Sequence, residues 1–324
     1  MNEQQRLLAD TADKLFETLG STAAFLEDWG QVEELGLPSL LVAEVDGGFG
    51  GTWDDALIVL RLAGAHALAL PVMEAALAAS LVSPGMIGFG SVAPQAVGEL
   101  RNGLFTGTLA AVPWGRHAAY VVTEIQRKTV SLGQPNSVKQ GQNLAGEPRD
   151  MLIYENAPVT EASPAPLLEL CALMRAGQMA GALDAALERS VAYVNERQQF
   201  GRPLAKFQAV QQNLASFAAE AAAVNCAAQG AARAACHDAA SFEIACAKLR
   251  ANMAAGLATA TAHQVHGAIG FTLEYDLHPF TRRLWSWRSE YGGDHFWALR
   301  LGTQVATRGA DRFWSDLTDK EIAA

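Results

Sequence analysis

The chain has 324 residues, a formal net charge of −10, half of its residues hydrophobic and 18% of them charged. A chain of this length can bury a sizeable core, and its acidity argues against a nucleic-acid partner because phosphate binding needs a basic face. No apolar run reaches membrane-spanning length. The polar start MNEQQRLLADTADKLF lacks the basic and apolar parts of a signal peptide, which favours a cytoplasmic protein without a membrane partner.

The first part of the chain has a helical pattern from about residue 2 to residue 82. Apolar residues recur every three or four positions in EQQRLLADTADKLFETL, and again over a longer stretch in WDDALIVLRLAGAHALALPVMEAALAASLV. The glycine-rich residues 47–51 between them follow no clear strand and lack the lysine of a phosphate-binding loop. We interpret them as a connection between helices, and residues 1–83 as an N-terminal helical domain.

Short segments that alternate or are rich in β-branched residues come next. FTGTLAAVPW, AAYVVTEI, KTVSL and DMLIYENAPV are of this kind, and glycine, asparagine and proline separate them. The stretch RKTVSLGQPNSVKQGQNLAGEPRD supplies residues that favour turns. This pattern predicts a reduced β domain over residues 84–162.

Long amphipathic helices are predicted for the remainder of the chain. They are APLLELCALMRAGQMAGALDAALERSVAYVNER, FQAVQQNLASFAAEAAAVNCAAQGAARAAC and FEIACAKLRANMAAGLATATAHQVHG. Alanine on their packing faces lets helices approach closely, as an antiparallel bundle requires. The predicted fold is therefore mostly α with a small central β domain, closed by a C-terminal four-helix bundle over residues 163–324.

The four cysteines, Cys171, Cys226, Cys236 and Cys246, form no CxxC pair and lie among alanines in helical segments. A metal or redox site is the functional interpretation of such residues. Small core residues in a reducing compartment explain the pattern better, and we predict no metal site.

Three segments resemble the signatures of one family. RQQFGRPLAKFQAVQ is similar to the R-x-x-F-G-x-x-(6)-Q hallmark of acyl-CoA dehydrogenases, and QVHGAIGFTLEYDLHPFTRR to their Q-x-x-G-G-x-G-(3)-E-(7)-R segment. WGQVEELGLPSLLVAEVDGGFGG resembles the signature of their first domain. The three occur in family order and span nearly the whole chain. The resemblance implies an acyl-CoA dehydrogenase-like fold, an FAD cofactor, and α,β-desaturation of an acyl-CoA thioester.

The resemblance implies that the first motif reaches an FAD bound by a neighbouring subunit. Arg197 and Gln199 would lie on its pyrophosphate and adenosine side, and Phe200 and Gln208 would complete that wall. Arginine suits the role because its planar fork meets phosphate oxygens bidentately and stays charged. The Gly-Arg-Pro that follows breaks the helix, so that these side chains can turn toward the partner chain. Without the resemblance, the stretch is equally typical of a helix hairpin with a solvated arginine.

In the second motif, Gln264, Gly267 and Gly270 occupy positions at which the family's backbone approaches the flavin nucleotide, and glycine permits such an approach. The second glycine of the family's pair is Ala268 here. His266 raises the possibility of acid–base chemistry, and we favour a structural histidine at a helix end.

Two departures from the family concern the flavin ring. The acidic-glycine-serine stretch, T-E-P-x-A-G-S-D in outline, has no counterpart between residues 83 and 107. In the family's W-I-[ST]-N-A strand, whose hydroxyl meets the ring, Trp114 remains but Arg116 and His117 replace the hydroxyl and the amide. The chain is predicted to lack its own flavin-ring cradle.

The catalytic base also departs from the family. Desaturation needs a carboxylate that removes the α-proton of the thioester while a hydride leaves the β-carbon. The family's two positions for this glutamate fall on Tyr291 and Cys171, with Glu290 and Glu169 close by. Glu290 can serve only if the loop shifts by one residue, which on a helix turns a side chain by about 100°. Otherwise both glutamates are surface charges at helix ends.

The predicted function is that of one subunit of an FAD-dependent acyl-CoA dehydrogenase. It would complete the FAD site of a second acyl-CoA dehydrogenase-like subunit, and it resembles the smaller chain of heteromeric steroid-type enzymes. The alternatives are a self-sufficient homodimer with Glu290 as base, and a non-catalytic scaffold or regulatory subunit. By resemblance, the pathway is lipid or steroid catabolism, and the electron acceptor is an electron-transferring flavoprotein, or oxygen in an oxidase variant.

Overall fold

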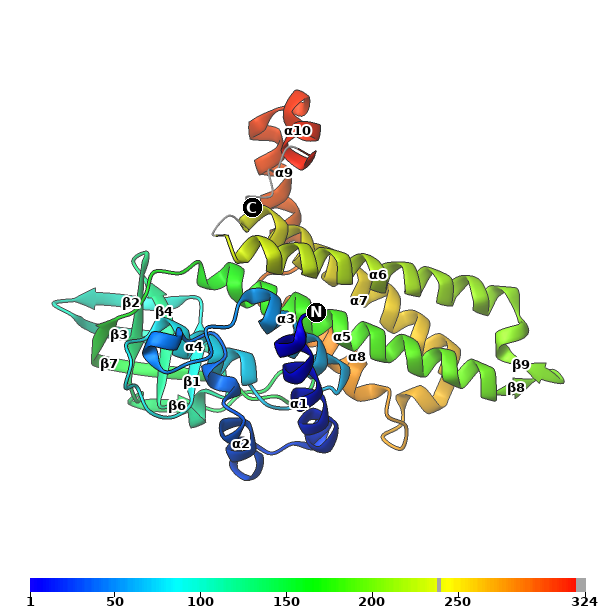
Figure 1. Ribbon diagram of the computed structural model, residues 1–324, viewed down its shortest axis with the longest axis horizontal. Helices are drawn as coiled ribbons and strands as arrows, with labels where there is room; N and C mark the ends of the chain where they lie inside the picture. Colours follow the sequence, from blue (N-terminus) through cyan, green and yellow to red (C-terminus); the bar gives the residue numbers. More distant parts are fainter. Residues whose placement is uncertain (238–239, 319–324) are drawn as a thin grey trace.

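The computed structural model describes residues 1–237 and 240–318. In this part of the chain, helices come first, a sheet follows, and long helices end the chain, so the predicted fold class is confirmed. The N-terminal helices and the sheet lie at one end of the molecule, and the long helices run from them to the other end (Figure 1). None of the helices in the described residues has both the length and the apolar composition needed to cross a membrane.

The N-terminal part consists of α1 (Glu3–Leu19), α2 (Phe25–Glu34), α3 (Trp53–Ala65) and α4 (Val72–Leu81). Residues 47–51 connect α2 and α3, as predicted. The single long helical stretch expected from residue 53 is wrong, because the chain leaves the helix between α3 and α4. Ala67 is left-handed there, with φ of 49°, and Pro71 both lacks an N–H and disfavours a helical conformation at the residue before it.

The sheet contains β1 (Gly90–Ala93), β2 (Ala96–Arg101), β3 (Leu104–Pro113), β4 (Tyr120–Ile125), β5 (Lys128–Leu132), β6 (Ser137–Lys139) and β7 (Arg149–Glu161). Their order is β1-β4-β5-β7-β3-β2, and β6 pairs with β7. Only β1 and β4 pair in parallel. The four predicted strands are confirmed. Strands β1, β2 and β6 were not predicted, because β1 and β6 are short and β2 is largely exposed.

The C-terminal helices α5 (Leu167–Glu196), α6 (Gln208–Ala235), α7 (Ser241–His266) and α8 (His278–Ser289) pack on one another. Most of the buried residues of α7 are alanines, which confirms the small packing faces read from the sequence. The sequence missed α8, α9 (Asp294–Arg308) and α10 (Phe313–Thr318). In Figure 1, α9 and α10 stand out from the side of the bundle.

Helices α3 and α5 cross with their backbones in contact. A Cβ atom added to Gly64 would lie 1.9 Å from the carbonyl oxygen of Gln178. One added to Gly181 would lie 1.8 Å from the carbonyl oxygen of Arg61. Because neither space can hold a methyl group, these two glycines set how closely the N-terminal helices sit on the bundle.

Candidate functional site

Helix α5 leads into a β-hairpin that carries the first family motif. Arg197 caps α5, and β8 (Gln198–Gln199) pairs with β9 (Arg202–Pro203) across the turn residues Phe200 and Gly201. Both turn residues are left-handed, with φ of 54° and 75°, which is the two-residue turn that matches the twist of paired strands. A phenylalanine is strained in this conformation. The break in the helical pattern is therefore a defined tight turn.

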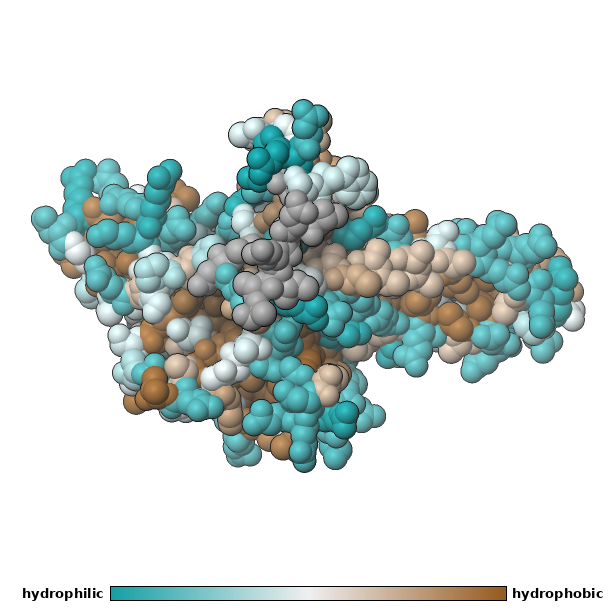
Figure 2. All heavy atoms as spheres, turned by 45° about the horizontal axis from the view of Figure 1, so that its top comes forward, coloured by the Kyte–Doolittle hydropathy of each residue, from teal (hydrophilic) through white to brown (hydrophobic). Residues whose placement is uncertain are grey.

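The hairpin lies at the far end of the molecule, to the right in Figure 1. Arg197, Gln199 and Gln208 are exposed, and Phe200 is 90% exposed. Within the described part of the chain, no hydrogen bond or ion pair holds the Arg197 guanidinium. Figure 2 shows a mainly hydrophilic surface over this end. A charged group that its own chain leaves unused is available to an anionic ligand.

The second family motif lies at the same end of the bundle. Tyr193, one turn before the hairpin, stacks on His266 at the end of α7, with the ring centroids 4.5 Å apart. Gln264 and Gly267 are exposed and line a pocket of about 450 Å³. The fold therefore brings the two motifs together, although the whole of α6 and α7 separates them in sequence.

The two glycines of this motif differ in their surroundings. Gly267 is exposed and ends α7 at φ 64° and ψ −142°, with open space where a Cβ atom would lie. Gly270 is buried, and a Cβ atom there would lie 2.9 Å from that of His266. Packing within the chain requires a glycine at 270. Close approach of Gly267 and Gly270 to a nucleotide stays a prediction.

His266 is buried at the end of α7, and its Nδ1 atom lies 2.7 Å from the carbonyl oxygen of Ala262. Burial lowers the pKa of its imidazole. A neutral histidine with a backbone partner and a stacked ring fits the structural role favoured from the sequence.

A row of buried charges joins the N-terminal helices, the sheet and the bundle. Carboxylates and guanidiniums alternate along it, and neighbouring groups lie 2.7–3.0 Å apart. Its members, in order, are Glu74, Arg175, Glu290, Arg149, Glu147 and Arg283. Sequence reasoning singled out only Glu290. The arginine inside the apolar stretch CALMRAGQM of α5 is a signal that could have been used, since a buried arginine is almost always paired.

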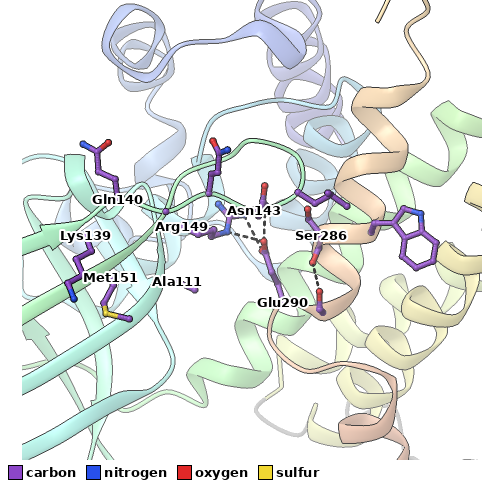
Figure 3. Close-up of a pocket in the computed structure, with 13 residues that line it drawn as sticks. Ala111, Lys139, Gln140, Asn143, Arg149, Met151, Ser286 and Glu290 are labelled. Carbon is purple, nitrogen blue, oxygen red and sulfur yellow. Dashed lines mark hydrogen bonds and ion pairs between the residues drawn. The ribbon is translucent and has the colours of Figure 1, made fainter. Parts of the chain in front are cut away.

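Glu290 lies inside this row, with a side chain that is only 16% exposed. It accepts hydrogen bonds from Arg149 Nε at 3.0 Å and Asn143 Nδ2 at 2.9 Å (Figure 3). It also accepts one from Arg175 Nε at 2.7 Å. Burial alone would raise its pKa, but the two guanidiniums prevail and lower the pKa of Glu290 to about 2.

These contacts correct the interpretation of Glu290 as a surface charge, because its carboxylate is enclosed and fully engaged. They also weigh against Glu290 as a general base. A carboxylate with so low a pKa is a poor proton acceptor, and a base must also reach the proton that it removes.

The two family positions of the base lie near each other, beside Arg175. The guanidinium of Arg175 is 5.2 Å from the centroid of the Tyr291 ring, and Cys171 lies one turn earlier on α5. Burial raises the pKa of both Tyr291 and Cys171 far above their ordinary values, so both are neutral and neither can remove a proton. The remaining candidate, Glu169, pairs with Arg300.

The residues that would hold a flavin ring in this chain are engaged with one another. Trp114 is buried, and the Arg149 guanidinium lies 5.3 Å from its ring centroid. Arg116, which replaces the family's hydroxyl, binds Asp150, with Nη2 2.6 Å from Oδ1 and Nε 3.0 Å from Oδ2. Both arginines are therefore engaged with groups of this chain, and the absence of a flavin-ring cradle stays a prediction.

An open pocket of about 660 Å³ remains beside the row of charges, between the sheet and α8 (Figure 3). Ala111 and Met151 of the sheet and Trp285 of α8 contribute to its walls. Residues 139–144 form another part of its lining, and Asn143 among them also donates to Glu147 at 2.8 Å. This segment ties the sheet to the bundle at the edge of the pocket.

The cysteines are free thiols in different surroundings. Cys171 is buried, Cys246 is half-buried, and Cys226 and Cys236 are exposed. The interpretation as core residues is therefore right for Cys171 and wrong for Cys226 and Cys236. In the part of the chain that the structure describes, no cluster of three or more His, Cys, Asp or Glu side chains could hold a metal ion.

Comparison with known proteins gives the same family as the motifs. The family profile described as "Acyl-CoA dehydrogenase, C-terminal domain" matches residues 167–293. Acyl-CoA dehydrogenase IpdE2 of Mycolicibacterium smegmatis is 26% identical over 307 residues, which cover 87% of this chain and 93% of the relative.

Two solved structures share the fold. A variant of the Tcur3481–Tcur3483 steroid ACAD superposes with a TM-score of 0.86 at 23% identity, covering 94% of this chain and 98% of that one. The ChsE4–ChsE5 complex from Mycobacterium tuberculosis superposes with a TM-score of 0.85 at 21% identity, covering 96% and 99%. The order of helices, a central sheet and a helical bundle is that of the acyl-CoA dehydrogenase fold. The chain is therefore similar to acyl-CoA dehydrogenases over most of its length, and its residues 167–293 match the profile of their C-terminal domain.

Proposed function

We propose that this chain is one subunit of an FAD-dependent acyl-CoA dehydrogenase whose second, homologous subunit holds the flavin ring and the catalytic base. The main support is the difference between the exposed Arg197 and the buried arginines of the chain. Arg197 is exposed and has no partner among the described residues, on a defined hairpin, whereas Arg149 and Arg175 hold Glu290 in ion pairs. The residues that would contact a neighbour's cofactor are therefore available, whereas the carboxylate next to the family's base position is engaged within the chain.

The exposed side chains are suited to complete an FAD site in the partner subunit. The FAD, when bound, would accept a hydride from the β-carbon of the thioester. Arg197 would meet its phosphate oxygens with a fixed fork of donors. The amides of Gln199, Gln208 and Gln264 offer both donors and acceptors, and Phe200 offers an apolar ring. All five side chains are exposed in the described structure, as contact with a second subunit requires.

The partner and the substrate class are proposed from the relatives. The names of the two superposed structures each join two chains, and one of them is a steroid ACAD. By analogy of fold and family, we propose a heteromer that desaturates a bulky CoA thioester in lipid or steroid catabolism. An electron-transferring flavoprotein is the proposed electron acceptor.

Two other functions would require different properties of Glu290 and Arg197. A homodimer with Glu290 as base needs a free carboxylate, and the ion pairs of Glu290 disfavour it. A non-catalytic scaffold is equally compatible with an engaged Glu290, but it does not require an exposed arginine on the hairpin. The response of FAD binding to a change of Arg197 separates the scaffold from the proposed subunit.

The visible spectrum of the purified chain, recorded alone and with a second acyl-CoA dehydrogenase-like subunit, tests the proposal. We expect a colourless protein that forms a yellow complex only with the partner. A stoichiometric flavin band in the isolated chain, together with turnover of an acyl-CoA, would overturn the proposal and favour the homodimer.

A further inference from the structure

Helix α7 exposes an apolar stripe that the described part of the chain leaves uncovered. Met253, Leu257 and Ala260 follow one another at spacings of four and three residues, so they lie on one face of the helix. All three are exposed, Leu257 to 38%, whereas most other residues of α7 are buried against the neighbouring helices. Single exposed apolar residues are ordinary, but a contiguous group of them is typical of an interaction surface.

Two aromatic side chains continue this stripe around a pocket. Phe271 and Trp285 line the pocket of about 450 Å³ together with Ala260. Both rings are exposed, Phe271 to 72%, and Phe271 stacks on the His263 ring with the centroids 4.3 Å apart. Aromatic side chains of this kind are enriched where a protein partner is anchored. The surface called the α7 face below consists of Met253, Leu257, Ala260, Phe271 and Trp285.

The charged groups beside the α7 face are paired within the chain. The guanidinium of Arg288 lies 5.3 Å from the Trp285 ring centroid, and its Nη2 atom lies 2.5 Å from Asp294 Oδ2. Arg250, one turn before the stripe on α7, pairs with Glu220 of α6. The five residues of the face carry no charge themselves. Depletion of charge is typical of the core of a protein–protein interface, and an anionic ligand would find no free cation here.

The position of the α7 face relative to the second family motif identifies its partner. Gln264 lies four residues beyond Ala260 and lines the same pocket. Under the proposed function, Gln264 and Gly267 contact an FAD that the second subunit holds. Leu257 lies seven residues before Gln264, about 10 Å along the helix. Since a stable interface buries about 800 Å² on each partner, a subunit that presents its cofactor to Gln264 also extends over Leu257.

We propose that the α7 face is the surface on which the homologous, FAD-holding subunit docks, and that this docking does not need FAD. The inference rests on the proposed function and adds to it the protein contact that joins the two subunits. Removal of apolar surface from water supplies the affinity. None of the five side chains of the face is among those proposed to contact the cofactor. The two subunits therefore associate first, and FAD enters a site that is already assembled.

Binding of variants to the FAD-free partner tests the docking surface. The tagged wild-type chain first isolates its acyl-CoA dehydrogenase partner, which is identified by mass spectrometry, purified by itself and freed of FAD. Calorimetry then measures the affinity of this apo-subunit for wild type, Leu257→Glu and Met253→Glu. Both changes place a charge on the α7 face and keep a good helix former. We expect wild type to bind the apo-subunit, and both variants to bind roughly tenfold or more weakly, with and without FAD.

Leu26→Glu is the matched control, because it changes an exposed leucine on α2, away from the bundle. It should bind the apo-subunit as wild type does. Circular dichroism of each variant shows whether it is folded, and the two positions on α7 give independent readings if one variant fails to fold.

Three results would overturn the docking surface. They are wild-type affinity in folded Leu257→Glu or Met253→Glu, association of the two subunits only when FAD is present, and a wild-type homodimer that either change converts to monomers. In the last case the face binds a second copy of this chain. Failure of the proposed function is distinct: Arg197→Ala would then leave FAD affinity unchanged while the subunits still associate. If the tagged chain retains no acyl-CoA dehydrogenase subunit, both the proposed function and the docking surface are wrong.

Discussion

The guanidinium of Arg175 lies 5.2 Å from the centroid of the Tyr291 ring while it binds Glu74 and Glu290 at 2.7 Å each. Tyr291 occupies one of the two positions at which the family places its catalytic glutamate. A buried cation and a neutral phenol therefore stand where desaturation needs a carboxylate. The same arginine joins α4, α5 and the turn after α8, because it pairs with both Glu74 and Glu290.

Glu290→Gln separates a structural carboxylate from a catalytic one. We expect a loss of about 3–5 kcal/mol in the free energy of unfolding, because Arg149 and Arg175 lose their shared counter-ion. Turnover of the assembled enzyme should persist at temperatures where the variant is folded. Urea unfolding and a turnover assay measure the two effects, with the exposed Glu124→Gln as control. Loss of turnover in a variant with intact fold and FAD content would instead identify Glu290 as the base.

Acid should remove the contribution of Glu290 at low pH. Its pKa falls from an ordinary 4.5 to about 2 in the folded state, so the stabilisation is fully present above about pH 5. It is lost as the pH falls toward 2, and amounts to about 3 kcal/mol at 1.36 kcal/mol per unit. Other carboxylates also titrate in acid, so the quantity to measure is the wild-type stability minus that of Glu290→Gln between pH 6 and pH 2. A difference that does not shrink in acid would contradict this assignment.

Arg197→Ala tests whether this side chain contributes to FAD binding in the complex with the partner subunit. Loss of a charge-assisted hydrogen bond of about 1.5–3 kcal/mol should weaken FAD binding by roughly ten- to 150-fold. Stability of the isolated chain should stay unchanged, because no group of the described chain pairs with this guanidinium. Flavin fluorescence titration measures the affinity, and Arg127→Ala, an exposed arginine of the sheet, is the control. Equal FAD affinity in both variants would favour the scaffold function.

Gly181→Ala should destabilise the fold by about 1–3 kcal/mol or more, because its methyl group would press on the backbone of α3. Gly230→Ala is the matched control on α6, where nothing lies within 4 Å of the added Cβ atom. That change should stabilise the chain by about 0.5–1 kcal/mol through helix propensity. Thermal unfolding of both variants is the measurement. Similar changes in the two would show that α3 and α5 do not touch as described.

The hairpin could be predicted from the sequence only in part. The glycine after Phe200 and the proline beyond it predicted a break between two helices, and the structure confirms the break. Its form, a two-residue turn with Phe200 itself left-handed, had no sequence signal, because phenylalanine rarely adopts that conformation. Similarly, helical periodicity runs through residues 53–82, and only Pro71 in the middle hinted that two helices share the stretch.

Local periodicity, turn residues and three family motifs determined the order of helices and sheet, the long helices of the bundle, and the family. These features depend on neighbours within a few residues of one another. The buried row of charges could not be predicted in the same way, because Glu74, Arg149, Arg175 and Glu290 come from distant segments that meet only when three parts of the chain pack. The tertiary structure alone decided that Glu290 is an engaged counter-ion, since the pKa of a carboxylate depends on which charges share its buried surroundings.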